Sequence, residues 1–171
     1  MSPDAEYTIR EATLADIPLL FEARHNMYVD LDDVVVPEDR DRVDAALAKY
    51  LASHANSGPI GFIAEDEAGA LVGAVSITHE QTQPSRPNLS GRQAYLYGMW
   101  VRPESRRQGV ARSLVSTAVE AARAVGAGAV TLMASDEGRP LYEGLGFNAV
   151  PAMRLSFDPT YDPSAHGEAP R

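Results

Sequence analysis

A short basic segment that contains a glycine separates an apolar run from a stretch with helical periodicity. It reads Arg106-Arg107-Gln108-Gly109-Val110-Ala111-Arg112-Ser113. Gly109 lets the backbone approach a ligand closely, and Ala111 keeps the first helical turn narrow. The free N–H groups of such a turn lie at the positive end of the helix dipole, where anions bind. The segment therefore predicts a site for a phosphate-bearing cofactor.

Other phosphate-binding motifs fit this segment less well. A P-loop ends in Gly-Lys-Ser/Thr and a dinucleotide fingerprint has the spacing Gly-x-Gly-x-x-Gly, and neither is present. A tight strand-to-helix connection without a ligand is the structural alternative. Arg106, Arg107 and Arg112 place positive charge where phosphates would lie, although solvated arginines on a helix edge would give the same pattern.

The elements that must position this segment follow from the apolar periodicity of the chain. A capping box at residues 13–16 precedes the first helix, and the turn-rich residues 66–69 join two strands as a hairpin. Gly98 interrupts an apolar strand, which is typical of a bulge. We expect strands at residues 7–10, 60–65, 71–78, 94–101, 129–134 and 153–157, and helices at residues 17–29, 39–54, 110–125 and 139–145.

This order predicts an α/β fold with a mixed, mostly antiparallel central sheet flanked by helices. The 171 residues suit a single domain, placed at residues 1–157. Residues 158–171 are rich in proline and poor in apolar side chains, which favours a flexible C-terminal tail.

Composition narrows the classes of function. The net charge of −9 argues against a nucleic-acid-binding protein and favours a cationic partner, although excess acid can simply aid solubility. The chain has no cysteine, which excludes disulfides and a cysteine-bound acyl intermediate. No apolar run is long enough to span a membrane, and the acidic N-terminus does not resemble a signal peptide, so we expect a cytoplasmic protein.

Across about residues 7–157 the chain resembles the GCN5-related N-acetyltransferase (GNAT) superfamily. The acyl-CoA signature of that family is Arg or Gln, two residues, Gly, one residue, then Gly or Ala, which Arg106, Gly109 and Ala111 match. The preceding strand Met99-Trp100-Val101, then Pro103, and the later run Leu141-Tyr142-Glu143-Gly144-Leu145-Gly146-Phe147 strengthen the match. The resemblance implies a GNAT-like acyl-CoA N-acyltransferase fold with acetyl-CoA as co-substrate and no metal.

The resemblance also implies where the cofactor lies. In this family the strand before the loop carries a bulge and splays from the next parallel strand, and the pantetheine arm bonds to main-chain groups in the gap. The side chains of Met99, Trp100 and Val101 would then belong mostly to the core. The residues expected at the cofactor are Met99, Trp100, Val101, Arg106, Arg107, Gln108, Gly109, Val110, Ala111, Arg112, Ser113 and Ser135.

Tyr142 occupies the position of the family's tyrosine near the CoA sulfur, where a phenol protonates the leaving thiolate as a general acid. Its alternative is a buried residue packed beside Phe147. Seven residues earlier, many members of the family have an asparagine, whereas this chain has Ser135. Serine can still cap the following helix, as can Asp136, so one cofactor hydrogen bond is weakened while the geometry is kept.

The general base is not evident, because Tyr95 and Tyr97 stand where many relatives have a glutamate. The candidates are His79 and Glu80 at a strand end, Asp30 after the first helix, or a water held by such groups. A cluster such as Asp30, Asp32 and Asp33 is more often a polar loop than a catalytic site. Tyr28 and Asp30 lie where the family's first helices cover the acceptor, and with Tyr97 they are the expected substrate-binding residues.

These observations predict an enzyme, an acyltransferase that moves the acetyl group of acetyl-CoA directly to a primary amine of a small cationic or amino-sugar-like molecule. A protein or peptide amine is the alternative acceptor, and a non-catalytic acyl-CoA sensor is the alternative class. We expect no nucleic-acid or membrane partner. The amine's identity, the acyl chain length and the oligomeric state, monomer or homodimer, stay open.

Overall fold

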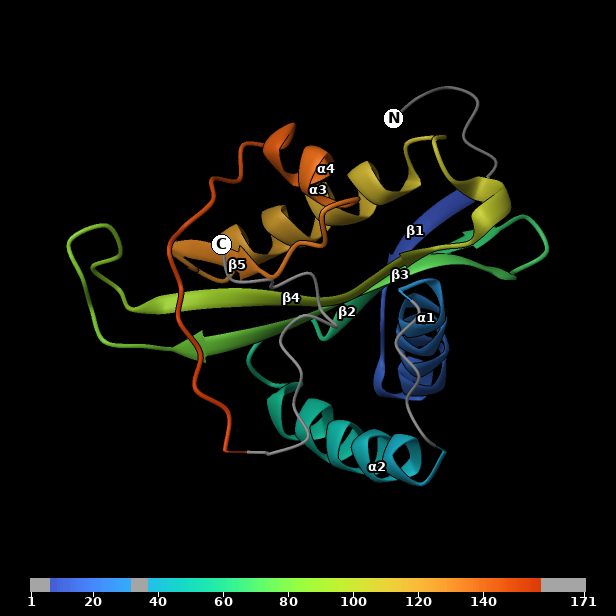
Figure 1. Ribbon diagram of the computed structural model, residues 1–171, viewed down its shortest axis with the longest axis horizontal. Helices are drawn as coiled ribbons and strands as arrows, with labels where there is room; N and C mark the ends of the chain where they lie inside the picture. The colour runs from blue at the N-terminus through green and yellow to red at the C-terminus, as the bar shows by residue number, and fades with distance from the viewer. Residues whose placement is uncertain (1–6, 32–36, 158–171) are drawn as a thin grey trace.

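A computed structural model describes residues 7–31 and 37–157 of the chain. Its centre is a five-stranded sheet in the order β1-β2-β3-β4-β5 (Figure 1). The first four strands pair antiparallel, whereas β5 runs parallel to β4, as the predicted mixed sheet requires. The strands are β1 (Tyr7–Glu11), β2 (Gly61–Asp66), β3 (Leu71–Gln81), β4 (Arg92–Val101) and β5 (Ala129–Leu132).

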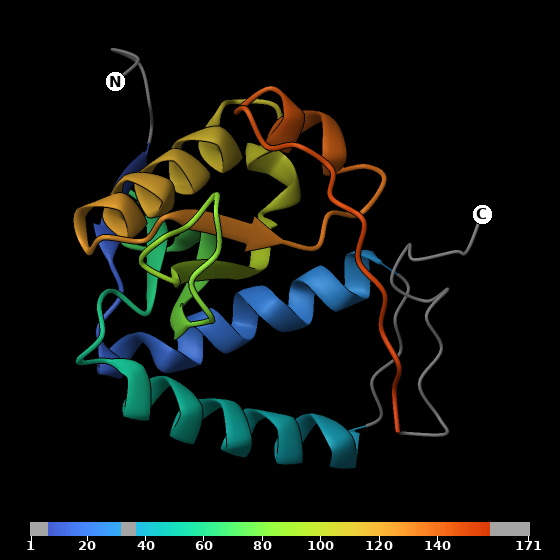
Figure 2. The same cartoon turned by 90° about the vertical axis from the view of Figure 1, so that its left-hand side faces the viewer.

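Helices cover both faces of this sheet. In Figures 1 and 2, α1 and α2 lie side by side on one face, and α3 and α4 lie on the other. The elements are α1 (Ile17–Asp30), α2 (Pro37–His54), α3 (Val110–Ala124) and α4 (Arg139–Glu143), with short 3-10 turns η1 (Leu14–Asp16) and η2 (Pro103–Ser105). All four helices and the first five strands of the sequence prediction are therefore confirmed, although α4 ends two residues earlier than expected.

The alternation of side chains along β3 divides the core into two parts. Val75 and Ile77 point to the α3 side, where they join Leu114 in one buried cluster. Ala74 points to the other side and joins Leu20 of α1 in a second cluster. Neighbouring residues of one strand thus bury helices on opposite faces of the sheet.

The start of α1 is fixed to the sheet by hydrogen bonds. The backbone N–H and the hydroxyl of Thr13 both donate to Asp16 Oδ2, at 2.8 and 2.7 Å, which confirms the expected cap. Arg10 of β1 pairs with Asp16 and with Glu65 of β2, each at 2.8 Å. These contacts set the angle at which α1 leaves the sheet.

The strand predicted at residues 153–157 is wrong, because residues 148–157 form neither helix nor strand. Met153, Leu155 and Phe157 alternate with polar residues as in a strand, yet each is largely exposed. A strand needs a neighbouring backbone for its hydrogen bonds, and alternation alone does not show that one is available. Asp32, Asp33 and the predicted tail at residues 158–171 lie outside the described residues.

No helix within residues 7–31 and 37–157 is long and apolar enough to cross a membrane. In the same ranges no group of three or more His, Cys, Asp or Glu side chains is placed to hold a metal ion.

Candidate functional site

The predicted bulge in β4 lies at Gly98. Trp100 pairs with Ala74 and Tyr97 pairs with Ser76, so three steps along β4 oppose two along β3. Gly98 has φ +58°, in the left-handed region that favours glycine. Because of the extra residue, Tyr97 and Trp100 both face the α1 and α2 side of the sheet.

Next to the bulge, β4 and β5 separate. Their parallel pairing ends at Leu96 with Leu132, while β4 continues to Val101. Within the described residues no strand pairs with this edge of β4 beyond Leu96, so its main-chain groups there are available to an extended ligand. Trp100 and Val101 are buried and Met99 is half-buried, as expected for side chains that belong mostly to the core.

The glycine loop leads directly into α3. Gly109 caps the helix with φ +88° and has no side chain with which to bond the first turn. The first helical bond runs from Ser113 N to Gly109 O at 3.0 Å, so the N–H groups of Val110, Ala111 and Arg112 are left for an external acceptor. A Cβ atom added to Gly109 would meet no atom within 4 Å, so the space beside Gly109 itself is open. The loop thus fits a phosphate group.

Several loop side chains already have partners within the protein. Arg106 donates to Asp30 at 2.5 Å and to the carbonyl of Val101 at 3.0 Å, which ties the loop to the end of α1. Arg112 donates to the carbonyl of Gly144, which follows α4. Among the other expected side chains, Gln108 donates to Glu104 O, Ser113 shares a hydrogen bond with Tyr7, and Arg107 is exposed with φ +63°. Phosphate recognition by the backbone therefore has better geometric support than recognition by these side chains.

Tyr142 lies on the α3 side of the sheet, where it and Met99 pack against the same buried cluster. Its ring contacts Phe147 edge-on, with 5.8 Å between centroids, and burial raises the pKa of its phenol. The Ser135 hydroxyl accepts a hydrogen bond from Gly138 N at 3.2 Å, and Ser135 O accepts one from Arg139 N at 2.9 Å. Ser135 therefore supports the turn before α4, as expected.

A cavity of about 200 Å³ lies on the opposite side, between α1, α2 and the bulge. Tyr97, one of the expected substrate residues, lines it, and burial together with nearby Glu80 raises the pKa of Tyr97 to about 12. Tyr28 does not line the cavity but accepts a hydrogen bond from Arg24, which does. Asp30 does not line the cavity. Its carboxylate accepts hydrogen bonds from Trp100 Nε1, at 2.9 Å, and from Arg106.

Among the cavity residues that sequence reasoning missed, Arg24 is the charged one. It stands four residues before Tyr28 on the predicted helix, so the two share one helix face. That spacing could have linked Arg24 to the expected substrate residue Tyr28. The sequence did not indicate that this helix face lies toward a cavity at Gly98.

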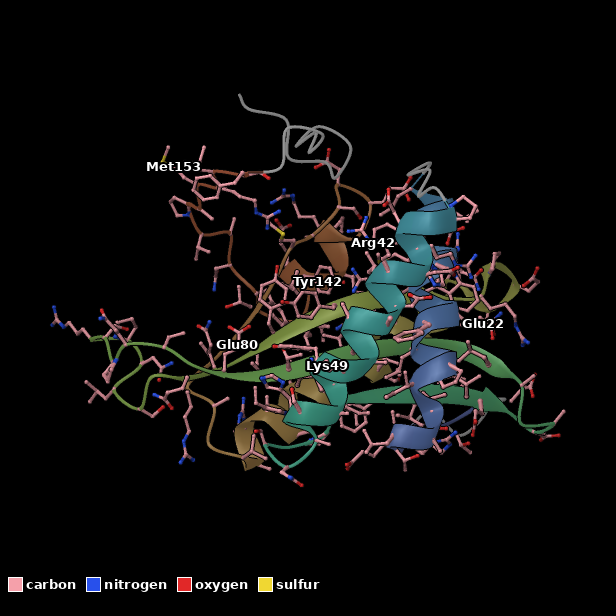
Figure 3. All side chains as sticks on the ribbon, turned by 90° about the horizontal axis from the view of Figure 1, so that it is seen from below. Glu22, Arg42, Lys49, Glu80, Tyr142 and Met153 are labelled. Carbon is pink, nitrogen blue, oxygen red and sulfur yellow. The ribbon has the colours of Figure 1, made fainter. Side chains whose placement is uncertain are left out.

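The two candidate bases differ in their surroundings. His79 Nε2 donates to the carbonyl of Pro59 at 3.1 Å, so the ring lies against the loop after α2. Glu80 lies on the same face of β3 as Ser76 and Thr78, which line the cavity, and accepts from Gln93 at 3.1 Å. Figure 3 looks onto this face, with α1 and α2 in front of the sheet and Glu80 labelled.

A larger cavity of about 420 Å³ lies on the far side of the loop and includes Tyr7, Asp66, Glu67, Arg102 and Gln108. Asp66 pairs with Arg102, which neutralises the basic side chain, and Glu67 adds negative charge. This cavity is therefore poorly suited to a phosphate. The strand gap and the α3 N-terminus form the better candidate site.

Comparison with known proteins agrees with this geometry. A family model described as "Acetyltransferase (GNAT) family" matches residues 21–147. A predicted acetyltransferase from Clostridium acetobutylicum, solved with acetyl-CoA, is 27% identical with a TM-score of 0.77, over 88% of this chain and 96% of that one. No curated protein sequence matches the chain significantly.

Two further solved structures share the fold at lower identity. A GCN5-related N-acetyltransferase from Ralstonia eutropha has a TM-score of 0.77 at 19% identity, over 88% of this chain and 98% of that one. A glucosamine-6-phosphate N-acetyltransferase from Arabidopsis thaliana has a TM-score of 0.65 at 19% identity, over 89% of this chain and 99% of that one.

Proposed function

Because the chain belongs to the GNAT acetyltransferase family, we propose that it transfers the acetyl group of acetyl-CoA directly to the primary amine of a small molecule. The observation that carries this proposal is the separation of β4 from β5 together with the N-terminus of α3, whose first N–H groups have no side-chain cap. An extended ligand could form hydrogen bonds with the unpaired edge of β4, while a phosphate at one end of it could bind the N–H groups at the start of α3. The neighbour from Clostridium acetobutylicum, which was solved with acetyl-CoA, supports the choice of donor.

In the proposed mechanism the amine nitrogen attacks the thioester carbonyl while both substrates are bound. The main-chain N–H groups of β4 beyond the bulge would orient the donor and stabilise the negative charge that develops on the carbonyl oxygen. The C–S bond then breaks, and the departing sulfur takes the proton of Tyr142. A phenol whose pKa is raised by burial keeps that proton throughout the neutral pH range.

The amine must lose a proton as the new bond forms. Glu80 has the better support as the acceptor of this proton, through a water molecule, because it shares the cavity face of β3. His79 is engaged with Pro59 and lies against another loop. Tyr142 and the cavity lie on opposite faces of the sheet, so the acid and the amine would approach the strand gap from its two sides.

The size of the cavity supports a small-molecule acceptor over a protein amine. At about 200 Å³ it is smaller than most ligand pockets, and its lining residues come from α1, α2 and the face of the sheet that these helices cover. The expected cationic or amino-sugar-like acceptor is one candidate within this class.

The test is a panel of amines mixed with acetyl-CoA, in which release of the free CoA thiol is measured. The panel covers amino sugars, polyamines, amino acids and peptide N-termini. Thiol release that depends on a small amine would support the proposal. Normal acetyl-CoA binding by calorimetry with no release from any amine would instead favour the acyl-CoA sensor, and release with peptides alone would favour a protein amine.

A further inference from the structure

The charge of the cavity beside Gly98 differs in sign from the charge of the whole chain. Gly98 and two leucines form part of its lining, and the remaining lining residues are polar or aromatic: Arg24, Tyr50, Ser76, Thr78 and Tyr97. Arg24 is the only charged side chain among these lining residues. The net charge of the whole chain is −9, but the one charged residue that an acceptor in the cavity would contact is positive.

The guanidinium of Arg24 is only partly satisfied. One terminal nitrogen donates to the hydroxyl of Tyr28 at 3.0 Å, and the guanidinium carbon lies 5.4 Å from the centre of the Tyr28 ring. Its Nε is buried and has no hydrogen-bond partner within the described parts of the chain, where Arg24 also forms no ion pair with a carboxylate. Leaving a buried charged donor without an acceptor is costly, so a partner from outside the protein is favoured.

A second unsatisfied polar group lines the same cavity. Thr78 is 2% exposed, and its hydroxyl has no hydrogen-bond partner among the residues described. Thr78 and Ser76 stand two residues apart on β3 and so share the cavity face. An oxygen atom placed in the cavity could accept from both the guanidinium of Arg24 and the hydroxyl of Thr78.

The position of Arg24 also relates this cavity to the strand gap. A side-chain carbon built on Gly98 would lie 3.6 Å from Cβ of Arg24, so α1 packs directly on the bulge. The bulge begins two residues after the last β4 residue that pairs with β5. A group held by Arg24 would therefore hold the rest of a small molecule next to the gap.

We infer that the acceptor is a small amine that also carries a carboxylate, and that Arg24 binds this carboxylate with help from Thr78. The inference rests on the proposed acetyl transfer and adds the acceptor's second functional group. A carboxylate is preferred to a phosphate because Arg24, the one charged residue in the lining, balances the single charge of a carboxylate, whereas a phosphate monoester carries nearly two charges at pH 7. Arg24 thereby orients the acceptor, while the amine points toward the gap.

The test compares matched pairs of amines with the unmodified protein. Each pair consists of an amino acid and its primary amide, such as alanine and alaninamide, which differ little in size. Charge-assisted hydrogen bonds predict that kcat/KM for the acid exceeds that for the amide by roughly 10- to 100-fold. Equal or faster acetylation of the amides, of polyamines or of phosphoethanolamine would overturn the inference and leave acetyl transfer intact. Absence of transfer to every amine would instead count against the proposed function.

Variants of Arg24 then test whether this residue binds the carboxylate of the acceptor. Arg24→Gln should raise KM for the carboxylate-bearing amine roughly tenfold or more, with little change for the amide, and Arg24→Lys should restore part of the loss. The affinity for acetyl-CoA, measured by calorimetry, should not change. Arg42→Gln is the matched control, because Arg42 is an exposed arginine of α2 that pairs only with nearby Asp39 among the ion pairs of the described residues (Figure 3). An equal loss of activity for acid and amide in Arg24→Gln would show a structural role and overturn the inference.

Discussion

At the scale of single residues, burial determines what the phenol of Tyr142 can do. Transfer of a phenol from water to an apolar setting disfavours the charged phenolate, so the pKa of Tyr142 lies above its ordinary value near 10. A general acid must hold its proton until the leaving group takes it. In the proposed role of general acid, a raised pKa therefore keeps Tyr142 in its active, protonated form to higher pH.

We expect Tyr142→Phe to lower kcat by about 100-fold, because the leaving sulfur loses its proton donor. The dissociation constant for acetyl-CoA should stay within about twofold, since the ring and its contact with Phe147 are kept. Steady-state kinetics and calorimetry measure the two quantities. A variant with unchanged kcat would remove Tyr142 from the mechanism.

The pH profile gives a check on the unmodified enzyme. Because the protonated phenol is the active form and its pKa is raised, deprotonation of Tyr142 should cause no loss of kcat below about pH 10. A decline of kcat with an apparent pKa near 8 that disappears in Tyr142→Phe would contradict the assigned environment.

Gly109 and Gly69 form a matched pair for testing the loop. Both have positive φ, +88° and +79°, and a side chain added to either would meet no atom within 4 Å. Gly109→Ala and Gly69→Ala should each lower the free energy of unfolding by about 1 kcal/mol through backbone strain. Only Gly109→Ala should weaken acetyl-CoA binding, by about tenfold, because the loop must shift the N–H groups at the start of α3. Equal acetyl-CoA affinity in both variants would contradict the loop assignment.

At the scale of elements, the end of α1 is fastened to the loop by Asp30. Its carboxylate accepts hydrogen bonds from Trp100 of β4 and from Arg106, whose side chain is 43% exposed. An exposed ion pair of this kind stabilises a protein by at most about 1 kcal/mol. Its more important effect is to hold α1, and with it the cavity wall, at a fixed place relative to the strand gap.

A double-mutant cycle tests whether Arg106 serves Asp30 or the phosphate. If Arg106 mainly holds α1, then Arg106→Ala and Asp30→Ala should be non-additive in the free energy of unfolding, with a coupling of roughly 0.5 kcal/mol or more. Acetyl-CoA affinity should change less than threefold in either variant. A large loss of affinity confined to Arg106→Ala would instead assign this side chain to phosphate binding.

The elements also show which parts of the molecule the sequence could predict. Gly98 and Gly109 could be interpreted from the sequence because both adopt a left-handed backbone conformation that favours glycine. Gly98 does so in the β4 bulge and Gly109 at the start of α3, and both features depend on residues that are close in the chain. The alternation at Met153, Leu155 and Phe157 was misleading, because strand formation depends on a distant partner. Two other features could not be predicted for a related reason. Tertiary packing decides that the helix face with Arg24 meets the bulge, and that the carboxylate of Asp30 reaches Trp100 and Arg106.

At the scale of the whole molecule, net charge did not reveal the charge of the residues that line the cavity beside Gly98. The net charge of −9 is a sum over the whole chain, and some of its carboxylates form ion pairs with arginines such as Arg10 and Arg102. The potential within a small enclosed cavity depends on the few groups that line it, because nearby charges in a partly dry setting are weakly screened. A negatively charged protein can therefore contain a site that binds an anion.

The cluster of Arg10, Asp16 and Glu65 makes the stability of the molecule depend on pH. Hydrogen bonds from Arg10 hold the pKa values of both Asp16 and Glu65 below their ordinary values in the folded state. Carboxylates with lowered folded pKa values stabilise the fold above their unfolded pKa of about 4, and this contribution is lost as the pH falls further. The cluster joins β1, β2 and the start of α1, so its loss affects the whole domain.

We therefore expect the free energy of unfolding to fall as the pH is lowered from about 5 to 2. Arg10→Gln should be less stable than the unmodified protein at pH 7, and its pH dependence should be shallower, so that the two curves converge at low pH. Arg42→Gln, which removes a far more exposed ion pair, should follow the unmodified protein throughout. Urea unfolding at several pH values measures all three curves. Parallel curves for Arg10→Gln and the unmodified protein would show that the cluster does not set the acid sensitivity, since a constant difference cannot arise from groups that titrate within this range.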